Sequence, residues 1–326
     1  MSEKMSEVYE AYDIEIKQTS RGRGATILKT DRGILQLRPL DVNESRLQAE
    51  YSFKEKLVEC GFESIDACIK NTENELVTYD RYGNPYVMRK YFEGREMSVN
   101  SREEIEQAVD NLANLHIAGR NVFKSTENDV HIRSNENFRK RNQELWRVKN
   151  YMLQRKPRRE FEDVFLKYFD KYYSEAVECE KLVVRSGLGD MENHIGYCHG
   201  MYNNHSILIE EDGRVCTVGF EKFHVGNQLT DLYHFARKAV EKNNYSFELL
   251  KLILERYSET CPISASDIEY IYILYMYPEK YYKLCNQYMN APKNWISPKM
   301  LDKINKLIED DEKKQKLLCN LRNLFV

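Results

Sequence analysis

The chain has 326 residues and a mass of 38.8 kDa, which is enough for two domains or for one large unit of two lobes. Hydrophobic residues make up 42% of it and charged residues 31%, and this balance excludes a disordered or fibrous protein. The formal net charge is −3 at pH 7, so the chain as a whole does not attract nucleic acids or acidic membranes. Any basic binding site must therefore be local.

Several features of the sequence bear on its cellular location. Residues 1–10 carry charged side chains and no apolar segment, so we expect no secretory signal. The most apolar stretch, Tyr270 to Pro278, is far shorter than the roughly 20 residues of a membrane helix. The eight cysteines show no regular spacing, which is typical of reduced thiols. These observations predict a cytoplasmic protein with neither a membrane span nor disulfides.

The first part of the chain has the pattern of short strands around one helix. Turn residues separate segments of alternating apolar and polar side chains, and the turn Asp31-Arg32-Gly33 indicates a hairpin. Apolar residues at helical spacing follow, ending at Gly61. The predicted strands are Tyr12–Gln18, Ala25–Lys29, Gly33–Arg38, Glu75–Tyr79 and Pro85–Tyr91, with a helix over Asn43–Cys60. We expect residues 1–92 to form an antiparallel-sheet lobe.

From Ser101 onward the apolar period is helical. Ser101 and Glu104 form a capping-box pattern at the start of the first helix. Further helices are predicted over 134–154, 160–183, 229–242, 246–259 and 267–289. One β-hairpin interrupts them, with strands Ser206–Glu210 and Arg214–Phe220. The pattern predicts an α+β protein in which residues 93–326 form a mainly helical lobe with an inserted hairpin.

Two short motifs lie next to that hairpin. Residues 199–206 read His-Gly-Met-Tyr-Asn-Asn-His-Ser, and residues 218–220 read Val-Gly-Phe. The first resembles the catalytic loop His-Gly-Asp-x-x-x-x-Asn of aminoglycoside phosphotransferases, and the second resembles their metal-binding Ile-Asp-Phe. The spacing between the two motifs also matches that superfamily without a gap. The resemblance implies a two-lobed protein-kinase-like fold.

The same resemblance assigns roles that this chain does not fill. Met201 stands at the position of the catalytic base, Ser206 at that of a metal-binding Asn, and Gly219 at that of the metal-binding Asp. A thioether and a glycine cannot hold magnesium, which requires oxygen ligands. Arg38 stands where a strand Lys would grip the nucleotide phosphates, with Glu50 as its expected helix partner. We therefore expect no catalytic residue, no metal and no cofactor, with at most weak nucleotide or phosphate binding.

A closer resemblance is to the CotS-type spore coat proteins. It is carried by Tyr197-Cys198-His199-Gly200, by Gly219-Phe220-Glu221-Lys222-Phe223, and by Tyr277-Pro278-Glu279-Lys280-Tyr281-Tyr282 with Trp295 downstream. Members of this family often lack intact kinase residues. The resemblance implies a non-catalytic structural or interaction component of the spore coat, with other coat proteins as partners.

The alternative is a small-molecule phosphotransferase whose metal ligands have been relocated. The candidate replacement ligands are Glu221, two residues beyond Gly219, and Asp190 or Glu192, shortly before the loop. Such a relocation must restore the ligand geometry to within fractions of an ångström.

Three weaker patterns remain open. Gly22 and Gly24 either place backbone N–H groups around phosphate or form a plain hairpin turn. Cys198, His199, His205 and Cys216 fit no common zinc spacing, and we expect His199 to fix its loop by hydrogen bonding. The segment 131–159 holds ten Lys or Arg residues against Glu136 and Glu144. It is either a solvated surface or a site for a polyanion.

Overall fold

The computed structural model describes residues 5–22, 24–125, 138–186, 192–291 and 298–325. Two compact units emerge from its contacts: Met1–His131 with Gly196–Val225, and Ile132–Ile195 with Gly226–Val326. The sequence places a lobe boundary between residues 92 and 93, and that boundary stays a prediction. The first unit extends beyond it, because the hairpin after residue 206 pairs with a strand next to the N-terminal sheet.

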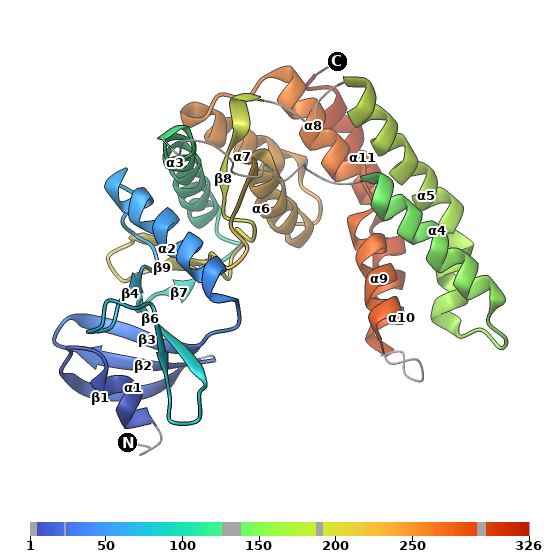
Figure 1. The fold of residues 1–326 in the computed structure, drawn as a ribbon. Coiled ribbons are helices and arrows are strands. Elements are labelled where there is room, and N and C mark those ends of the chain that lie inside the picture. The colour runs from blue at the N-terminus through green and yellow to red at the C-terminus, as the bar shows by residue number, and fades with distance from the viewer. Residues whose placement is uncertain (1–4, 23, 126–137, 187–191, 292–297, 326) are drawn as a thin grey trace. The chain divides into compact units, whose positions relative to one another are not determined.

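The first unit combines sheets with two long helices (Figure 1). Its elements are α1 (Ser6–Glu10), β1 (Ile16–Gly22), β2 (Ala25–Thr30), β3 (Gly33–Pro39), α2 (Glu44–Glu59), β4 (Cys68–Ile69), β5 (Val77–Tyr79), β6 (Pro85–Lys90), β7 (Arg95–Glu96), α3 (Arg102–Ser125), β9 (Ile207–Ile209) and β10 (Val215–Thr217). The chain passes between the units at β8 (Ile195–Cys198) and at β11 (His224–Asn227).

The main sheet of the first unit is antiparallel. Its strand order is β1-β2-β3-β6-β4, and β5 also pairs with β6. Gly33 has φ +99° in the predicted hairpin turn, a conformation that glycine adopts readily. Asn43 begins α2 because its side chain accepts a hydrogen bond from the backbone N–H of Arg46. A smaller sheet of order β10-β9-β7 carries the second hairpin.

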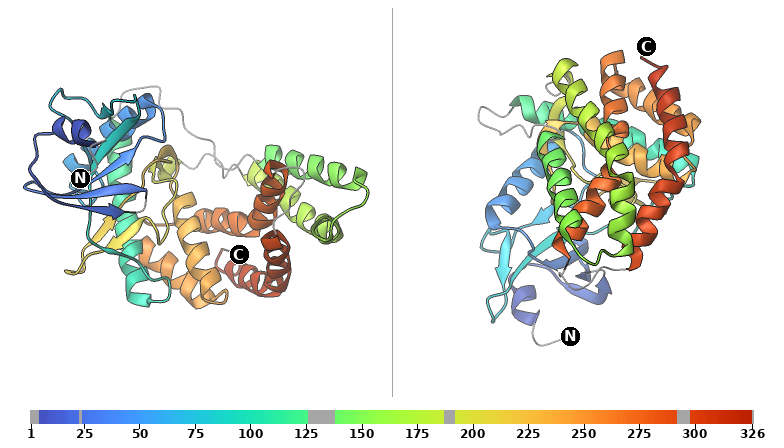
Figure 2. Two further views of the ribbon diagram at one scale, coloured as in Figure 1. Left: turned by 90° about the horizontal axis from the view of Figure 1, so that it is seen from below. Right: turned by 90° about the vertical axis from the view of Figure 1, so that its right-hand side faces the viewer.

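The second unit consists mainly of helices (Figure 2). They are α4 (Phe138–Gln154), α5 (Glu160–Ser186), the short 3₁₀ helix Glu192–His194, α6 (Leu229–Lys242), α7 (Phe247–Thr260), α8 (Ala265–Met276), α9 (Glu279–Asn290), α10 (Pro298–Glu309) and α11 (Asp311–Arg322). Stacked aromatic side chains form part of its core, such as Phe165 against Tyr281 with ring centroids 4.2 Å apart. None of the described helices has both the length and the apolar character needed to cross a membrane.

One predicted helix is wrong. The segment 267–289 is not continuous, since α8 ends at Met276 and α9 begins at Glu279. Pro278 disfavours helical backbone at the residue before it, and Tyr277 accordingly has ψ 131°. The apolar period continues across this break, so the period alone did not reveal it.

Candidate functional site

The loop that resembles a catalytic loop is held by a buried histidine. His199 is fully buried, and its Nδ1 accepts a hydrogen bond from the backbone N–H of Met201 at 3.2 Å. The proton therefore lies on Nε2, which donates to the carbonyl oxygen of Val218 at 3.1 Å. The expectation that His199 fixes the loop is confirmed. The hydrogen bond to Val218 joins the loop to the second motif.

A tyrosine and a serine complete the loop. Tyr202 is buried, and its hydroxyl donates to the carbonyl oxygen of Ala108 in α3 at 2.7 Å. Asn111 of the same helix donates to the Tyr202 hydroxyl at 2.9 Å. The Ser206 hydroxyl lies 2.9 Å from the Asn203 carbonyl oxygen and also accepts from the Asn203 N–H. Ser206 is used within the loop, so its side chain closes a turn at the position to which the resemblance assigns a metal-binding Asn.

A cleft of the first unit brings the sequence-predicted positions together. Its volume is about 270 Å³. It is lined by Gln36, Arg38, Asp66, Tyr91, Phe92, Met201, Asn203, His205, Ser206, Leu208, Val218, Gly219 and Glu221. Met201, Ser206, Gly219 and Arg38 thus share one site, whereas Gly22, Gly24 and Glu50 are not among its lining residues.

Gly22 and Gly24 belong to the hairpin between β1 and β2. Gly22 is paired with Ala25, and Gly24 has φ +66°. This geometry is that of a hairpin turn, the simpler of the two interpretations of the sequence. Arg23, between them, lies outside the described residues.

The expected pair of Arg38 with Glu50 is wrong. Arg38 lies 3.7 Å from Glu221, across the cleft lining. Glu50 is fully buried and is bound by Lys54 at 2.6 Å and by both terminal nitrogens of Arg89. Arg89, on β6, and Lys54, one turn further along α2, provide the positive charge that the sequence analysis assigned to Arg38.

Glu50, Lys54, Asp66 and Arg89 form a buried ionic cluster with no net charge. The Lys54 ammonium donates to Asp66 Oδ1 at 2.7 Å and to the Asp66 carbonyl oxygen at 2.9 Å. Each of the four residues is at most 3% exposed. Burial of four charges is tolerated only when each has a close opposite partner, as here.

The ionic cluster contacts Gly219, the position to which the resemblance assigns the metal-binding Asp. Asp66 Oδ2 accepts a hydrogen bond from the backbone N–H of Gly219 at 3.2 Å, and Arg89 lies 3.5 Å from the same oxygen. Sequence reasoning missed Asp66 and Lys54. The spacing of Lys54 four residues after Glu50 was a usable signal, whereas nothing local distinguished Asp66.

The ionic cluster predicts a loss of stability in acid. Burial by itself raises the pKa of Glu50, but Lys54 and Arg89 outweigh it and lower this pKa to about 2. A carboxyl with a lowered folded-state pKa stabilises the fold above its unfolded pKa, and this contribution is lost as the pH falls. We expect about 3 kcal/mol to disappear between roughly pH 5 and pH 2, measured by denaturant unfolding. A Glu50→Gln variant should show a shallower decline, and an unchanged decline would contradict the assignment.

The cleft does not fit a magnesium ion held in the manner of a phosphotransferase. Met201 is 44% exposed but offers only a thioether, and Gly219 offers no side chain. Asp66 is already bound to Lys54 and Arg89, which leaves Glu221 as the only other carboxylate in the lining. Within the described residues, no three His, Cys, Asp or Glu side chains are placed to hold a metal ion. Asp190 and the side chain of Glu192 lie outside what the structure describes.

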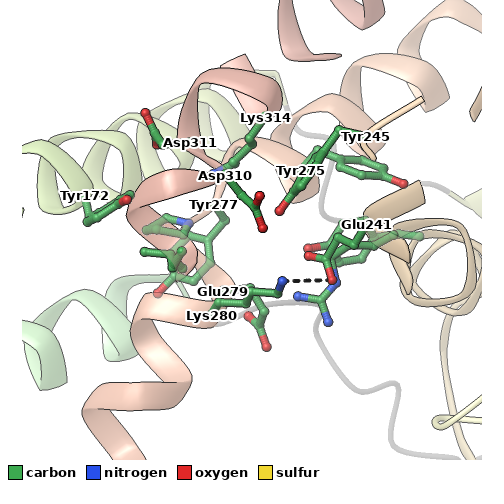
Figure 3. Close-up of a pocket in the computed structure, with 14 residues that line it drawn as sticks. Tyr172, Glu241, Tyr245, Tyr275, Tyr277, Glu279, Lys280, Asp310, Asp311 and Lys314 are labelled. Atoms are coloured by element: carbon green, nitrogen blue, oxygen red, sulfur yellow. Dashed lines mark ion pairs between the residues drawn. The ribbon is translucent and has the colours of Figure 1, made fainter. Parts of the chain in front are cut away.

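A second pocket lies in the second unit and is lined by tyrosines (Figure 3). Tyr172, Tyr245, Tyr275 and Tyr277 contribute to it, and Lys280 pairs there with Glu241 at 3.1 Å. Its volume is about 40 Å³, against about 270 Å³ for the cleft by the same measure. That is room for a few water molecules and not for a metabolite. The dense tyrosines of this region are therefore core residues with hydroxyl groups at the edge of a small cavity.

Solved structures define the class of fold. An aminoglycoside phosphotransferase from Alicyclobacillus acidocaldarius matches with a TM-score of 0.82 at 18% identity, covering 97% of this chain and 95% of its own. An AMP-bound spectinomycin phosphotransferase matches with a TM-score of 0.67 at 11% identity, covering 93% and 94%. A choline kinase from Cryptosporidium parvum matches with a TM-score of 0.57 at 11% identity, covering 94% and 90%. The protein thus has the two-lobed kinase-like fold that the sequence predicted.

The family follows from the sequence itself. Residues 5–321 match the family described as spore coat putative kinase YutH, so the chain belongs to that family. The resemblance to spore coat proteins of the CotS type is thereby confirmed. Comparison with curated proteins gives no match.

Proposed function

We propose that this protein is a non-catalytic, kinase-like component of the spore coat that acts through structure and interactions. One observation carries the proposal: hydrogen bonds of His199 and Ser206 hold the loop 199–206 in place, while Met201, Ser206 and Gly219 provide none of the carboxylate and amide groups that the resemblance assigns to phosphoryl transfer. The association with the coat rests on membership of the spore coat family.

The size of the catalytic loss supports this reading. Loss of the base alone slows an enzyme by about 10²- to 10⁴-fold, which raises the activation free energy by roughly 3–5 kcal/mol, and some activity survives. Without the metal ligands as well, it loses most of the electrostatic stabilisation of the transferred phosphoryl group. A scaffold needs only the fold, and the ionic cluster and the hydrogen bonds of His199 maintain that fold without a ligand.

The alternative remains a phosphotransferase with relocated ligands, and one observation favours it. Glu221 lies in the cleft lining, and its side chain is 39% exposed. Its carboxylate is also 3.7 Å from the Arg38 guanidinium, which competes with a metal ion for it. A single carboxylate is a poor magnesium site unless substrate phosphates and water supply the other ligands.

An activity assay separates the two functions. We expect no magnesium-dependent transfer of the γ-phosphoryl group of ATP to water, spectinomycin, other aminoglycosides or choline, because Met201, Ser206 and Gly219 stand at the positions that the resemblance assigns to the base and the metal ligands. Radiolabelled ATP gives the required sensitivity. Turnover that persists through purification and disappears in Glu221→Ala would establish the alternative and overturn the proposal.

The coat association has its own test. We expect a tagged copy of the protein, expressed from its own promoter, to be found in the coat fraction of spores and not in the core fraction. Finding the protein only in the core or only in vegetative cells would contradict a role in the coat.

A further inference from the structure

Helix α4 packs against α5 and α9 in the second unit (Figures 1 and 2). Many of its other residues are exposed. Its buried residues follow the helical period and are Phe138, Asn142, Leu145, Val148 and Met152. The helix begins where the described part of the basic segment 131–159 begins, so the structure shows which of those charges are neutralised.

Several cations of this segment are already paired. Arg141 pairs with Glu279 and Lys149 with Asp170, both at 2.8 Å. Two more pairs follow α4: Arg155 with Glu162 at 3.3 Å and Arg158 with Asp163 at 2.8 Å. Much of the excess charge is therefore already paired within the second unit.

Two exposed arginines of α4 have no carboxylate partner among the described residues. Arg139 and Arg147 are exposed, and no carboxylate of the described residues lies within 4 Å of either. The only acidic residue of α4 is Glu144, which accepts a hydrogen bond from the Tyr282 hydroxyl at the contact with α9. The exposed face of α4 is therefore basic without any acidic side chain.

Aromatic side chains accompany these arginines. Trp146 is 45% exposed and Tyr151 38%. The Trp146 ring packs against Tyr173 with centroids 5.4 Å apart, and the Lys149 ammonium lies 5.0 Å from that ring. Trp146 is thus a supported side chain that keeps much of its surface in solvent. We call Arg139, Trp146, Arg147 and Tyr151 the α4 surface.

The composition of the α4 surface favours a protein partner over a nucleic acid. Trp, Tyr and Arg are the residues that most often dominate the binding energy of protein interfaces. Nucleic-acid binding rests on many phosphate contacts, whereas the α4 surface offers two arginines, which stand about 12 Å apart along one helix.

We propose that the α4 surface binds an acidic polypeptide segment of another protein. Carboxylates of that segment pair with Arg139 and Arg147, and its apolar or aromatic side chains pack on Trp146 and Tyr151. The proposal rests on the proposed function, because it locates the contact through which a coat component would be held by its partner.

A binding measurement with a defined probe tests this inference. Fluorescently labelled poly-L-glutamate should bind the full-length protein with an affinity that falls as salt rises. The double variant R139E/R147E should bind about tenfold more weakly or worse, since it turns two attractions into repulsions. Trp146→Ala should also weaken binding. The matched control K167E/K299E makes the same change of charge at exposed lysines of α5 and α10, and its affinity should stay within about twofold of the wild type.

Three results would overturn the inference: unchanged affinity in R139E/R147E, an equal loss in the control, or tighter binding of a single-stranded oligonucleotide than of poly-L-glutamate. Failure of the proposed function is recognised separately, by tagging the same variants in spores. If the wild type reaches the coat and R139E/R147E reaches it equally well, the α4 surface is not the coat contact. If the wild type itself is absent from the coat, the proposed function fails first.

Discussion

Replacing Lys54 by methionine is expected to lower the free energy of unfolding of the protein by about 3–5 kcal/mol. The Lys54 ammonium lies 2.6 Å from Glu50 and 2.7 Å from Asp66, and all three side chains are buried. Methionine fills a similar volume but leaves two carboxylates with Arg89 as their only cation. The variant should melt about 10 °C lower in calorimetry.

The control is Lys56→Met on the same helix. Lys56 is half-buried and lies outside the ionic cluster, so its replacement should change the stability by less than about 0.5 kcal/mol. A similar cost for both variants would mean that the ionic cluster is not what holds α2 in place. Asp66→Asn is a second test of the contribution of the ionic cluster to stability, because it also removes the negative charge beside the Gly219 N–H.

Replacing Gly200 by alanine is expected to cost about 3 kcal/mol. Gly200 has φ +80°, and a Cβ atom there would lie 2.1 Å from the backbone carbonyl oxygen of Lys222. A backbone carbonyl cannot move aside as easily as the end of a flexible side chain. The loop 199–206 must therefore move away from residues 222–224 in this variant. The glycine is therefore required by close packing as well as by its dihedral angle.

Gly213→Ala separates these two causes. Gly213 has nearly the same φ, +82°, but no atom lies within 4 Å of the position of its Cβ. Its replacement should cost only the left-handed strain, about 1 kcal/mol. If the two alanine variants lose equal stability, as measured by denaturant unfolding, the contact with Lys222 contributes nothing.

The fold could be predicted from the sequence because its signals are local. The strands β2, β3, β5 and β6 and the helix α6 follow from apolar period and turn residues, and α6 coincides with the predicted 229–242. Strand β1 begins four residues later than predicted, and the two-residue strand β4 was not predicted. The break between α8 and α9 depended on one residue, Pro278, within a continuous apolar period. Contacts such as β7 with β9 were not predictable, since two-residue strands carry no pattern.

The candidate site was predictable where it follows a motif and not where it depends on tertiary packing. Met201, Ser206 and Gly219, which the motifs single out, all line one cleft. The predicted partner of Glu50 was wrong. Arg38 was chosen because it stands where the resemblance places the strand Lys, whereas Arg89 and Lys54 are the residues that bind Glu50 in the structure. Asp66 lies in a loop, and only the three-dimensional structure shows it beside Gly219.

Thermal unfolding with ATP, with and without magnesium, tests the central claim most directly, because it needs no knowledge of a phosphate acceptor. The backbone N–H groups of Lys90 and Tyr91 already donate to Ala67 and Ile34, so a nucleotide finds few donors on this strand, and the cleft offers no magnesium site beyond Glu221. We predict a dissociation constant weaker than about 100 μM and a melting temperature that magnesium does not raise further. A large magnesium-dependent rise would show that ATP and the metal bind together, and would contradict a non-catalytic cleft.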